Sequence, residues 1–148
     1  MLGACHNEGP TRKEIVFRHL NAAGAGLEIG PCHNALAPKR EGYNVKILDH
    51  LSSDGLRKKY DGHAGVDTTS IEEVDYVWSG QPFADLTDER FDWITASHVI
   101  EHTTCLITFI NDCASILRPD GILSLVIQIS AASTSCARSR AWHALSMR

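Results

Sequence analysis

The chain of 148 residues is 43% hydrophobic and 22% charged, which is the composition of a single globular domain and excludes a disordered chain. Its net charge of -4 at pH 7 argues against a nucleic-acid-binding surface, because such a surface needs basic side chains to replace the counterions of the phosphates. Five cysteines without a C-x-x-C pair, with no signal-peptide pattern and no run of ~18 apolar residues, predict a cytoplasmic protein without a membrane span.

The predicted elements alternate between helices and strands. After a flexible lead over residues 1–10, Thr11 and Glu14 form the T-x-x-E pattern of a capping box, which predicts a helix to about Ala23. Short apolar runs bounded by turn residues predict five strands, at 27–30, 44–49, 74–78, 91–97 and 122–127. Further helices are predicted at 34–39, 52–60 and 103–117, with a turn at 118–121. This alternation favours an α/β fold with a doubly wound, mainly parallel sheet.

Two other parts of the sequence lie outside this pattern. The short basic runs at 39–40 and 57–59 are predicted to be solvated helix faces. Residues 130–148 are rich in Ser, Ala and Arg and have no period that would build a strand, so at best they predict a marginal amphipathic helix. We therefore expect an incomplete domain at 11–127, followed by a non-native or disordered tail at 128–148.

Candidate site residues follow the first two strands, because ligands of open parallel sheets bind beyond the carboxyl ends of the strands. Gly30 would let the backbone approach a ligand closely, and Glu28 lies inside the same strand end. Asp49 closes the second strand about 20 residues after Gly30, the spacing at which an acid accepts hydrogen bonds from ribose hydroxyls. Alone, these residues suit an ordinary turn and a helix cap, but together they favour a ribose-binding site.

The third and fourth strands add two more candidates. Gly80 and Gln81 are placed to line an adenine slot, whereas Trp78 is expected to pack in the core. The segment His98–His102 has the H-x-x-E-H pattern, which on a helix would hold zinc between two imidazoles with a glutamate as general base. A zinc site needs a third protein ligand, and the helix here is expected to begin only after His102. We therefore predict no metal.

Five motifs resemble, in their order and spacing, those of class I S-adenosylmethionine-dependent methyltransferases of the type 11 group. They lie at 27–30 (LEIG), 47–49 (ILD), 91–94 (FDWI), 97–102 (SHVIEH) and 117–123 (LRPDGIL). The resemblance implies a Rossmann-like methyltransferase fold with about five strands, from which the last two strands of the family are missing. Asp120 stands where the family usually has a glycine.

The resemblance further implies S-adenosyl-L-methionine as cofactor and methyl transfer to an unknown small-molecule or macromolecular acceptor. The residues that we assign to cofactor binding are Glu28, Gly30, Pro31, Asp49, His50, Gly80, Ser97 and His98. His98, Glu101 and His102 are the candidate catalytic residues, since an imidazole that titrates near about pH 6.5 can deprotonate an acceptor. Methyl transfer requires alignment and a base but no metal.

The tail limits this assignment. Relatives of the subgroup often show Pro-Asp-Lys-Arg after the fifth strand, and codons chosen to encode residues 127–134 give Pro-Asp-Lys-Arg-Cys-Phe-Asp when read from the last base of the Ile127 codon. We therefore hypothesise a frameshift after Ile127, which gene sequencing would test and which would leave the fifth strand with an open edge. A non-catalytic fragment is the alternative function. A nicotinamide-dependent enzyme is disfavoured because the sequence lacks the glycines of its fingerprint. A zinc hydrolase is disfavoured because the sequence shows no third zinc ligand.

Overall fold

The structure is a computed structural model that describes residues 10–128 and 142–147. The flexible lead expected at 1–10 therefore lies, except for Pro10, outside the described residues. The same holds for residues 129–141 of the expected tail.

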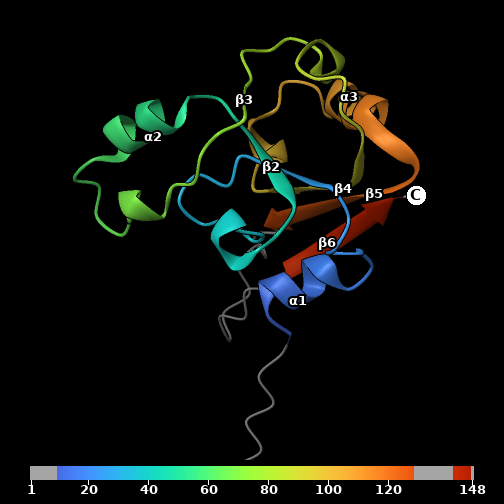
Figure 1. The fold of residues 1–148 in the computed structure, drawn as a ribbon, viewed down its shortest axis with the longest axis horizontal. Coiled ribbons are helices and arrows are strands. Elements are labelled where there is room, and N and C mark those ends of the chain that lie inside the picture. The colour runs from blue at the N-terminus through green and yellow to red at the C-terminus, as the bar shows by residue number, and fades with distance from the viewer. Residues whose placement is uncertain (1–9, 129–141, 148) are drawn as a thin grey trace, which may run out of the picture.

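A single sheet of six strands runs through the described chain, in the order β3-β2-β1-β4-β5-β6 (Figure 1). The strands are β1 (Gly26–Ile29), β2 (Val45–Asp49), β3 (Tyr76–Val77), β4 (Phe91–Ser97), β5 (Leu117–Gln128) and β6 (Trp142–Met147). The pairs from β3 through β5 are all parallel, and β6 alone joins the sheet antiparallel to its neighbour. The prediction of an α/β fold with a mainly parallel sheet is confirmed.

Helices cover both faces of this sheet. The α-helices are α1 (Arg12–Phe17), α2 (Ser53–Tyr60) and α3 (Leu106–Ile116), and short 3-10 helices lie at Lys39–Glu41, Thr68–Ser70, Phe83–Asp85 and Ile100–His102. Figure 1 shows α1 and α3 on opposite sides of the strands β4 to β6. In the described part of the chain, no helix combines the length and the apolar character needed to cross a bilayer.

The main apolar core lies between the sheet and α3. It contains, among others, Leu27 and Ile29 of β1, Ile94 of β4, and Phe109 and Cys113 of α3, all of them buried. A smaller cluster on the other face packs Val16 of α1 against Leu36 and Val126. Alternate residues of each strand thus enter different clusters, as the period of two in a strand requires. Apolar packing therefore holds the sheet on both faces. The loops at the carboxyl ends of its strands can form a site.

Several predicted boundaries are wrong in instructive ways. The capping box of Thr11 and Glu14 forms as predicted, but the helix ends at Phe17 and not near Ala23. No α-helix forms at 34–39, because the backbone amides of Leu36 and Ala37 donate to the Glu28 carboxylate and hold the segment as a loop. The third strand shrinks to two residues, and the predicted turn at 118–121 lies inside the long strand β5.

The expectation that residues 130–148 build no strand is also wrong. Residues 142–147 form β6 and pair with 123–128 of β5, from Leu123 opposite Met147 to Gln128 opposite Trp142. An edge strand presents a row of unpaired backbone N–H and C=O groups, and this pairing satisfies them whatever the side-chain pattern of the added strand. The open edge that we expected on the fifth strand is therefore covered along this stretch.

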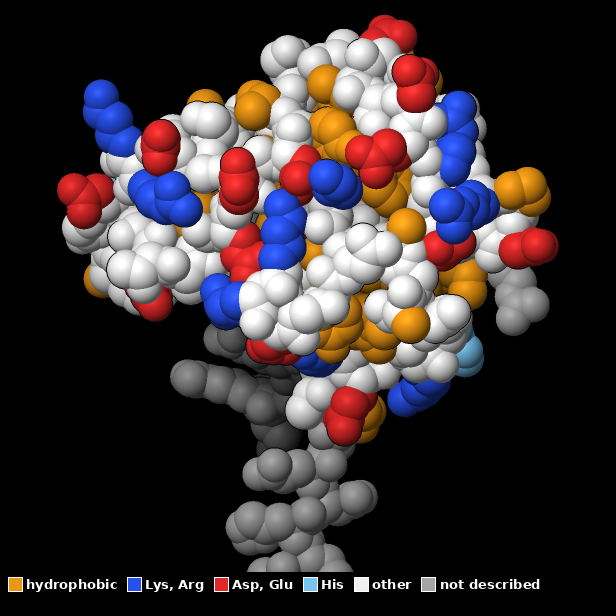
Figure 2. Space-filling model, in the orientation of Figure 1, with side chains coloured by type: hydrophobic (Ala, Val, Ile, Leu, Met, Phe, Trp, Pro, Cys, Tyr) orange, Lys and Arg blue, Asp and Glu red, His pale blue; other side chains and the backbone are white. Residues whose placement is uncertain are grey.

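Charged side chains on the surface are mixed in sign. On the face seen in Figure 2, Lys and Arg side chains alternate with Asp and Glu. Lys39 and Lys46 both contact Asp75, with Nζ–Oδ distances of 2.5 and 3.3 Å, and Arg118 contacts Asp92 at 2.6 Å. Lys39 is therefore engaged in an ion pair and is not part of a simply solvated helix face.

Candidate functional site

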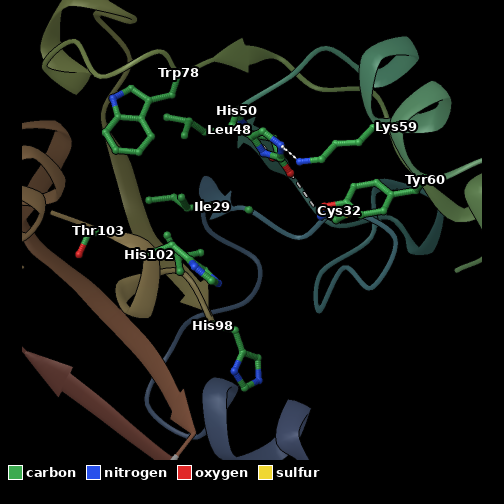
Figure 3. A pocket seen from close by; sticks show the side chains of 13 residues that line it. Ile29, Cys32, Leu48, His50, Lys59, Tyr60, Trp78, His98, His102 and Thr103 are labelled. Carbon is green, nitrogen blue, oxygen red and sulfur yellow. Dashed lines mark hydrogen bonds and ion pairs between the residues drawn. The ribbon is translucent and has the colours of Figure 1, made fainter. Parts of the chain in front are cut away.

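Two adjoining cavities lie at the carboxyl ends of the parallel strands, and Figure 3 shows the first of them. The first, of about 500 Å³, is lined by Ile29, Gly30, Cys32, Leu48, Asp49, His50, Lys59, Tyr60, Trp78, His98, Val99, His102 and Thr103. The second, of about 380 Å³, is lined by His50, Trp78, Ser79, Gly80, His102, Thr103, Thr104, Cys105, Thr108, Phe109 and Asp112. Four residues line both cavities, which makes them one continuous site. A first cavity of this size is in the range of small-molecule sites.

The turn after β1 forms one wall of the first cavity. Gly30 has φ of 65° and donates its N–H to the Leu48 carbonyl at 2.8 Å. A Cβ at this position would come within 2.8 Å of Val99 Cγ2, so glycine is required by both the backbone conformation and the space. Cys32 also has a positive φ, of 49°, and lines the cavity. Pro31 lies in the turn but outside the lining of both cavities.

Glu28 is buried but does not line either cavity. Its side-chain oxygens accept hydrogen bonds from the backbone amides of Leu36 at 2.7 Å and Ala37 at 3.1 Å. Burial raises the pKa of the Glu28 carboxyl above its ordinary value, while the two amide hydrogen bonds and the charge of Arg12 oppose that rise. In this structure, Glu28 therefore holds the loop behind the site.

Asp49 is the buried acid that faces the first cavity. Only 3% of the residue is exposed. Its Oδ1 accepts hydrogen bonds from the backbone N–H of His50 at 2.7 Å and contacts His50 Nδ1 at 2.6 Å. Its Oδ2 accepts from the backbone N–H of Cys32 at 3.3 Å. A carboxylate has about four acceptor positions; three are occupied here, so Asp49 keeps one, on Oδ2, for a hydroxyl group of a ligand.

His50 links Asp49 to a lysine of helix α2. Its Nε2 lies 2.9 Å from Lys59 Nζ, and this contact is drawn in Figure 3. The Lys59 ammonium also lies 5.2 Å from the centre of the Tyr60 ring. Residues 57–59 are exposed on α2, as predicted for a solvated helix face, and Lys59 in addition lines the cavity.

The loop after β3 forms the far wall of the second cavity. Gly80, with φ of 106°, lines it together with Ser79. Trp78 packs edge-on against Phe83 with ring centroids 5.6 Å apart, as the core prediction requires, but it also lines both cavities. Gln81 does not line the second cavity. Its backbone carbonyl accepts a hydrogen bond from Trp78 Nε1 at 2.7 Å.

The segment after β4 brings two histidines to the site. His98 has the left-handed φ of 58°, lines the first cavity, and places Nδ1 3.6 Å from Glu101 Oε1. His102 lines both cavities, whereas Glu101 and Ser97 line neither. The Ser97 hydroxyl is buried without a hydrogen-bond partner among the described residues. A non-glycine residue in the left-handed region is a mark of functional sites.

The helical zinc arrangement is not formed. His98 lies outside any helix, and only Ile100–His102 form a short 3-10 helix, so the two imidazoles are not one α-helical turn apart. Within residues 10–128 and 142–147, no three His, Cys, Asp or Glu side chains gather in a group that could hold a metal ion. The α3 helix starts at Leu106, after His102 as predicted.

The lining of the first cavity includes residues that the sequence prediction did not assign to the site, among them Cys32, Lys59 and Tyr60. Lys59 and Tyr60 are the last two residues of α2, the helix that follows Asp49. The end of this helix lies beside the cavity at the strand ends. The position of this basic run after the candidate acid Asp49 was a signal for site residues. The charge pattern of the run alone indicates only an exposed helix face. Burial raises the pKa of the Cys32 thiol, and the charge of Asp49 adds to that rise.

Known proteins resemble the chain in sequence and in fold. The model of the type 11 methyltransferase domain family matches residues 27–125. A ubiquinone biosynthesis O-methyltransferase from Bradyrhizobium sp. (strain ORS 278) is 36% identical over 64 residues, which are 42% of this chain and 21% of that protein. The chain therefore spans about a fifth of this curated relative.

Solved structures share the fold at low sequence identity. The glycopeptide N-methyltransferase MtfA complexed with S-adenosyl-L-homocysteine superposes with a TM-score of 0.57 at 19% identity, over 92% of this chain and 62% of that chain. A SAM dependent methyltransferase from Aquifex aeolicus gives a TM-score of 0.58 at 13% identity, over 85% and 69% of the two chains. The family model covers more than half of the chain and includes both the Gly30 turn and Asp49. The chain belongs to the type 11 methyltransferase domain family.

Proposed function

We propose that the protein is an S-adenosyl-L-methionine-dependent methyltransferase. The single observation that carries the proposal is the buried Asp49 carboxylate, which faces a cavity of about 500 Å³ beside the Gly30 turn. A buried acid costs free energy unless it is bonded, and the remaining acceptor position of Asp49, on Oδ2, suits a hydroxyl of a ribose. The names of the relatives support the same cofactor, since MtfA was solved with S-adenosylmethionine, S-adenosylhomocysteine and sinefungin.

The shape of the site fits this cofactor. Gly30 lines the first cavity, and its lack of a Cβ lets Val99 pack against the turn, because an added Cβ would lie 2.8 Å from Val99 Cγ2. The methionine part would lie along this turn, and the ribose at Asp49. The adenine would enter the second cavity, between His50 and the Trp78–Gly80 loop. Of the other assigned residues, Glu28 and Pro31 would act by holding the loop.

Once bound, the cofactor supplies an electrophilic methyl group on a sulfonium. The protein must then align an acceptor and take up its proton. His98 reaches the cavity from the end of β4, and Glu101 lies 3.6 Å from its Nδ1. We propose that His98 accepts the acceptor's proton at Nε2, that Glu101 stabilises the imidazolium, and that His102 lines the acceptor side.

The acceptor is proposed to be a small molecule or a peptide that carries an O–H or N–H nucleophile. Among the relatives, the Bradyrhizobium protein is named as an O-methyltransferase and MtfA as a glycopeptide N-methyltransferase. A base such as His98 is useful for both kinds of acceptor, because each must lose a proton when its new bond to carbon forms.

Calorimetric titration of the full chain with S-adenosylhomocysteine tests the cofactor assignment. We expect saturable binding with one site per chain. A folded chain that gives no binding heat and no ligand-induced rise in melting temperature contradicts the proposal. The base is tested separately: His98→Ala should retain this binding but lose transfer of a radiolabelled methyl group to an acceptor that the wild-type chain methylates.

A further inference from the structure

Lys59 lines the first cavity, although the charge pattern of its basic run suggested only a solvated helix face. Figure 3 shows its side chain reaching from α2 toward His50. The Nζ to Nε2 distance is 2.9 Å, and Nζ lies 5.2 Å from the centre of the Tyr60 ring. The ammonium is thus placed on an imidazole and not on a carboxylate, and this choice has a chemical consequence for Asp49.

The direction of each hydrogen bond in this chain of contacts follows from the donors available. A lysine ammonium has three donors and no acceptor, so His50 Nε2 must be the acceptor. A neutral imidazole that accepts at Nε2 carries its proton on Nδ1. That proton then points to Asp49 Oδ1, which is 2.6 Å away. Lys59 therefore selects the His50 tautomer that donates to Asp49.

The selected tautomer fixes Oδ1 of Asp49 and leaves an acceptor position on Oδ2 for a ligand. Oδ1 receives two donors from His50, its backbone N–H at 2.7 Å and Nδ1 at 2.6 Å. Oδ2 receives only the Cys32 amide among the described residues, at 3.3 Å. With the other tautomer, a nitrogen lone pair would face the carboxylate at Oδ1, and the two groups would repel and reorient.

We propose that Lys59 is a positioning residue for the ribose of the cofactor, which acts through the tautomer of His50 on the orientation of Asp49. The proposal rests on the proposed function, since it needs a ribose at Asp49. It assigns no contact between Lys59 and the ligand, so Lys59 is not a catalytic residue. Its prediction is specific: the contribution of Lys59 to affinity should depend on the hydroxyls that Asp49 binds.

The test is a cycle between a variant and a ligand, measured by calorimetry on the full chain. We expect Lys59→Met to weaken binding of S-adenosylhomocysteine about fivefold, since one hydrogen bond at a half-open site is changed indirectly. The same variant should bind an analogue that lacks both ribose hydroxyls as well as the wild type binds it. Lys59→Arg, which keeps a donor, should stay close to wild type. Lys58→Met is the matched control, because Lys58 is exposed on the same helix and lines neither cavity.

A second measurement reads the tautomer directly. Nitrogen NMR of the His50 ring in the ligand-free protein should show a protonated Nδ1 and an unprotonated Nε2, and Lys59→Met should remove this bias. The proposal is overturned if Lys59→Met leaves the affinity unchanged, if it weakens both ligands equally, or if Nε2 carries the proton in the wild type. A wild-type chain that does not bind S-adenosylhomocysteine contradicts the proposed function and the ribose role with it, whereas the NMR result reports separately on the contact with His50.

Discussion

The ends of β1 and β2 each carry a buried acid, but the two acids serve different neighbours. Glu28 and Asp49 are 2% and 3% exposed. Ile29 pairs with Leu48 in parallel register, so Asp49 lies opposite Gly30 and two residues beyond the level of Glu28. Because side chains alternate along a strand, both acids belong to the same face of the sheet. Asp49 lies closer to the carboxyl end of the sheet than Glu28 does. For this reason Asp49 lines the cavity, whereas Glu28 binds the amides of the loop.

This comparison teaches that a buried acid near a strand end is not by itself a ligand contact. Both acids accept from two backbone amides, but Glu28 lines neither cavity and holds the loop, whereas Asp49 lines the first cavity and keeps one acceptor position on Oδ2 for a ligand. The two roles predict different results for the same kind of substitution: loss of Glu28 should chiefly lower stability, and loss of Asp49 should chiefly weaken binding.

The largest effect is expected from Glu28→Ala. Removal of the carboxylate leaves the buried amides of Leu36 and Ala37 without their acceptor, which should lower the free energy of unfolding by about 3 kcal/mol. Urea denaturation measures this change. Glu73→Ala is the control, because Glu73 is exposed and should change stability by less than about 0.5 kcal/mol. Equal stability of the two variants would show that Glu28 does not hold the loop.

Asp49→Ala should chiefly affect binding. Loss of the hydrogen bond from a ribose hydroxyl to a charged acceptor is expected to weaken binding of S-adenosylhomocysteine about fiftyfold. Calorimetry measures the affinity, with Asp54→Ala as the control, since the Asp54 side chain is 96% exposed and lies outside both cavities. The distinction between the acids fails if Asp49→Ala binds as tightly as the Asp54 control.

Gly30→Ala should have an intermediate effect. The left-handed backbone costs an L-residue about 1–2 kcal/mol, and the new methyl group would also meet Val99 Cγ2 at 2.8 Å. Gly62→Ala is the matched control: its φ is 71° and its added Cβ would have no atom within 4 Å. In thermal or urea unfolding, Gly30→Ala should lose about 1 kcal/mol more than Gly62→Ala. Adding Val99→Ala should reduce that difference; if it does not, the close approach to Val99 is not the cause.

The smallest effect is a change of stability with pH. Because burial raises the pKa of Glu28 above its ordinary value of 4.5, the folded state binds this proton more tightly than the unfolded state does. The contribution of Glu28 to stability is then fully present below about pH 4.5 and is lost as the pH rises through the raised pKa. The stability of the wild type relative to Glu28→Gln should therefore increase as the pH falls from about 7 to about 5. Urea titrations at each pH check the sign, and a decrease would contradict it.

The sequence predicted the parts of the fold that depend on local pattern. The alternation of apolar runs and turn residues located five parallel strands, and the spacing of Gly30 and Asp49 located the edge of the sheet where the cavity lies. The capping box at Thr11 formed because both of its partners are within one turn. These features need no knowledge of distant contacts.

Features that depend on distant contacts could not be read in the same way. The loop at 34–39 is held by Glu28, and Lys59 reaches its imidazole only because α2 returns toward the strand ends. The strand β6 forms against the edge of β5, although its own composition gave no strand signal. In each case a tertiary partner decided the outcome against the local pattern.

The most direct test of the central claim is the amide NMR spectrum of the full chain during titration with S-adenosylhomocysteine. If the ligand binds at Asp49 and Glu28 only holds the loop, the amides of Gly30, Cys32 and Asp49 should shift saturably, while those of Leu36 and Ala37 should stay nearly unchanged. The largest shifts at Leu36 and Ala37, with none at Asp49, would contradict this account.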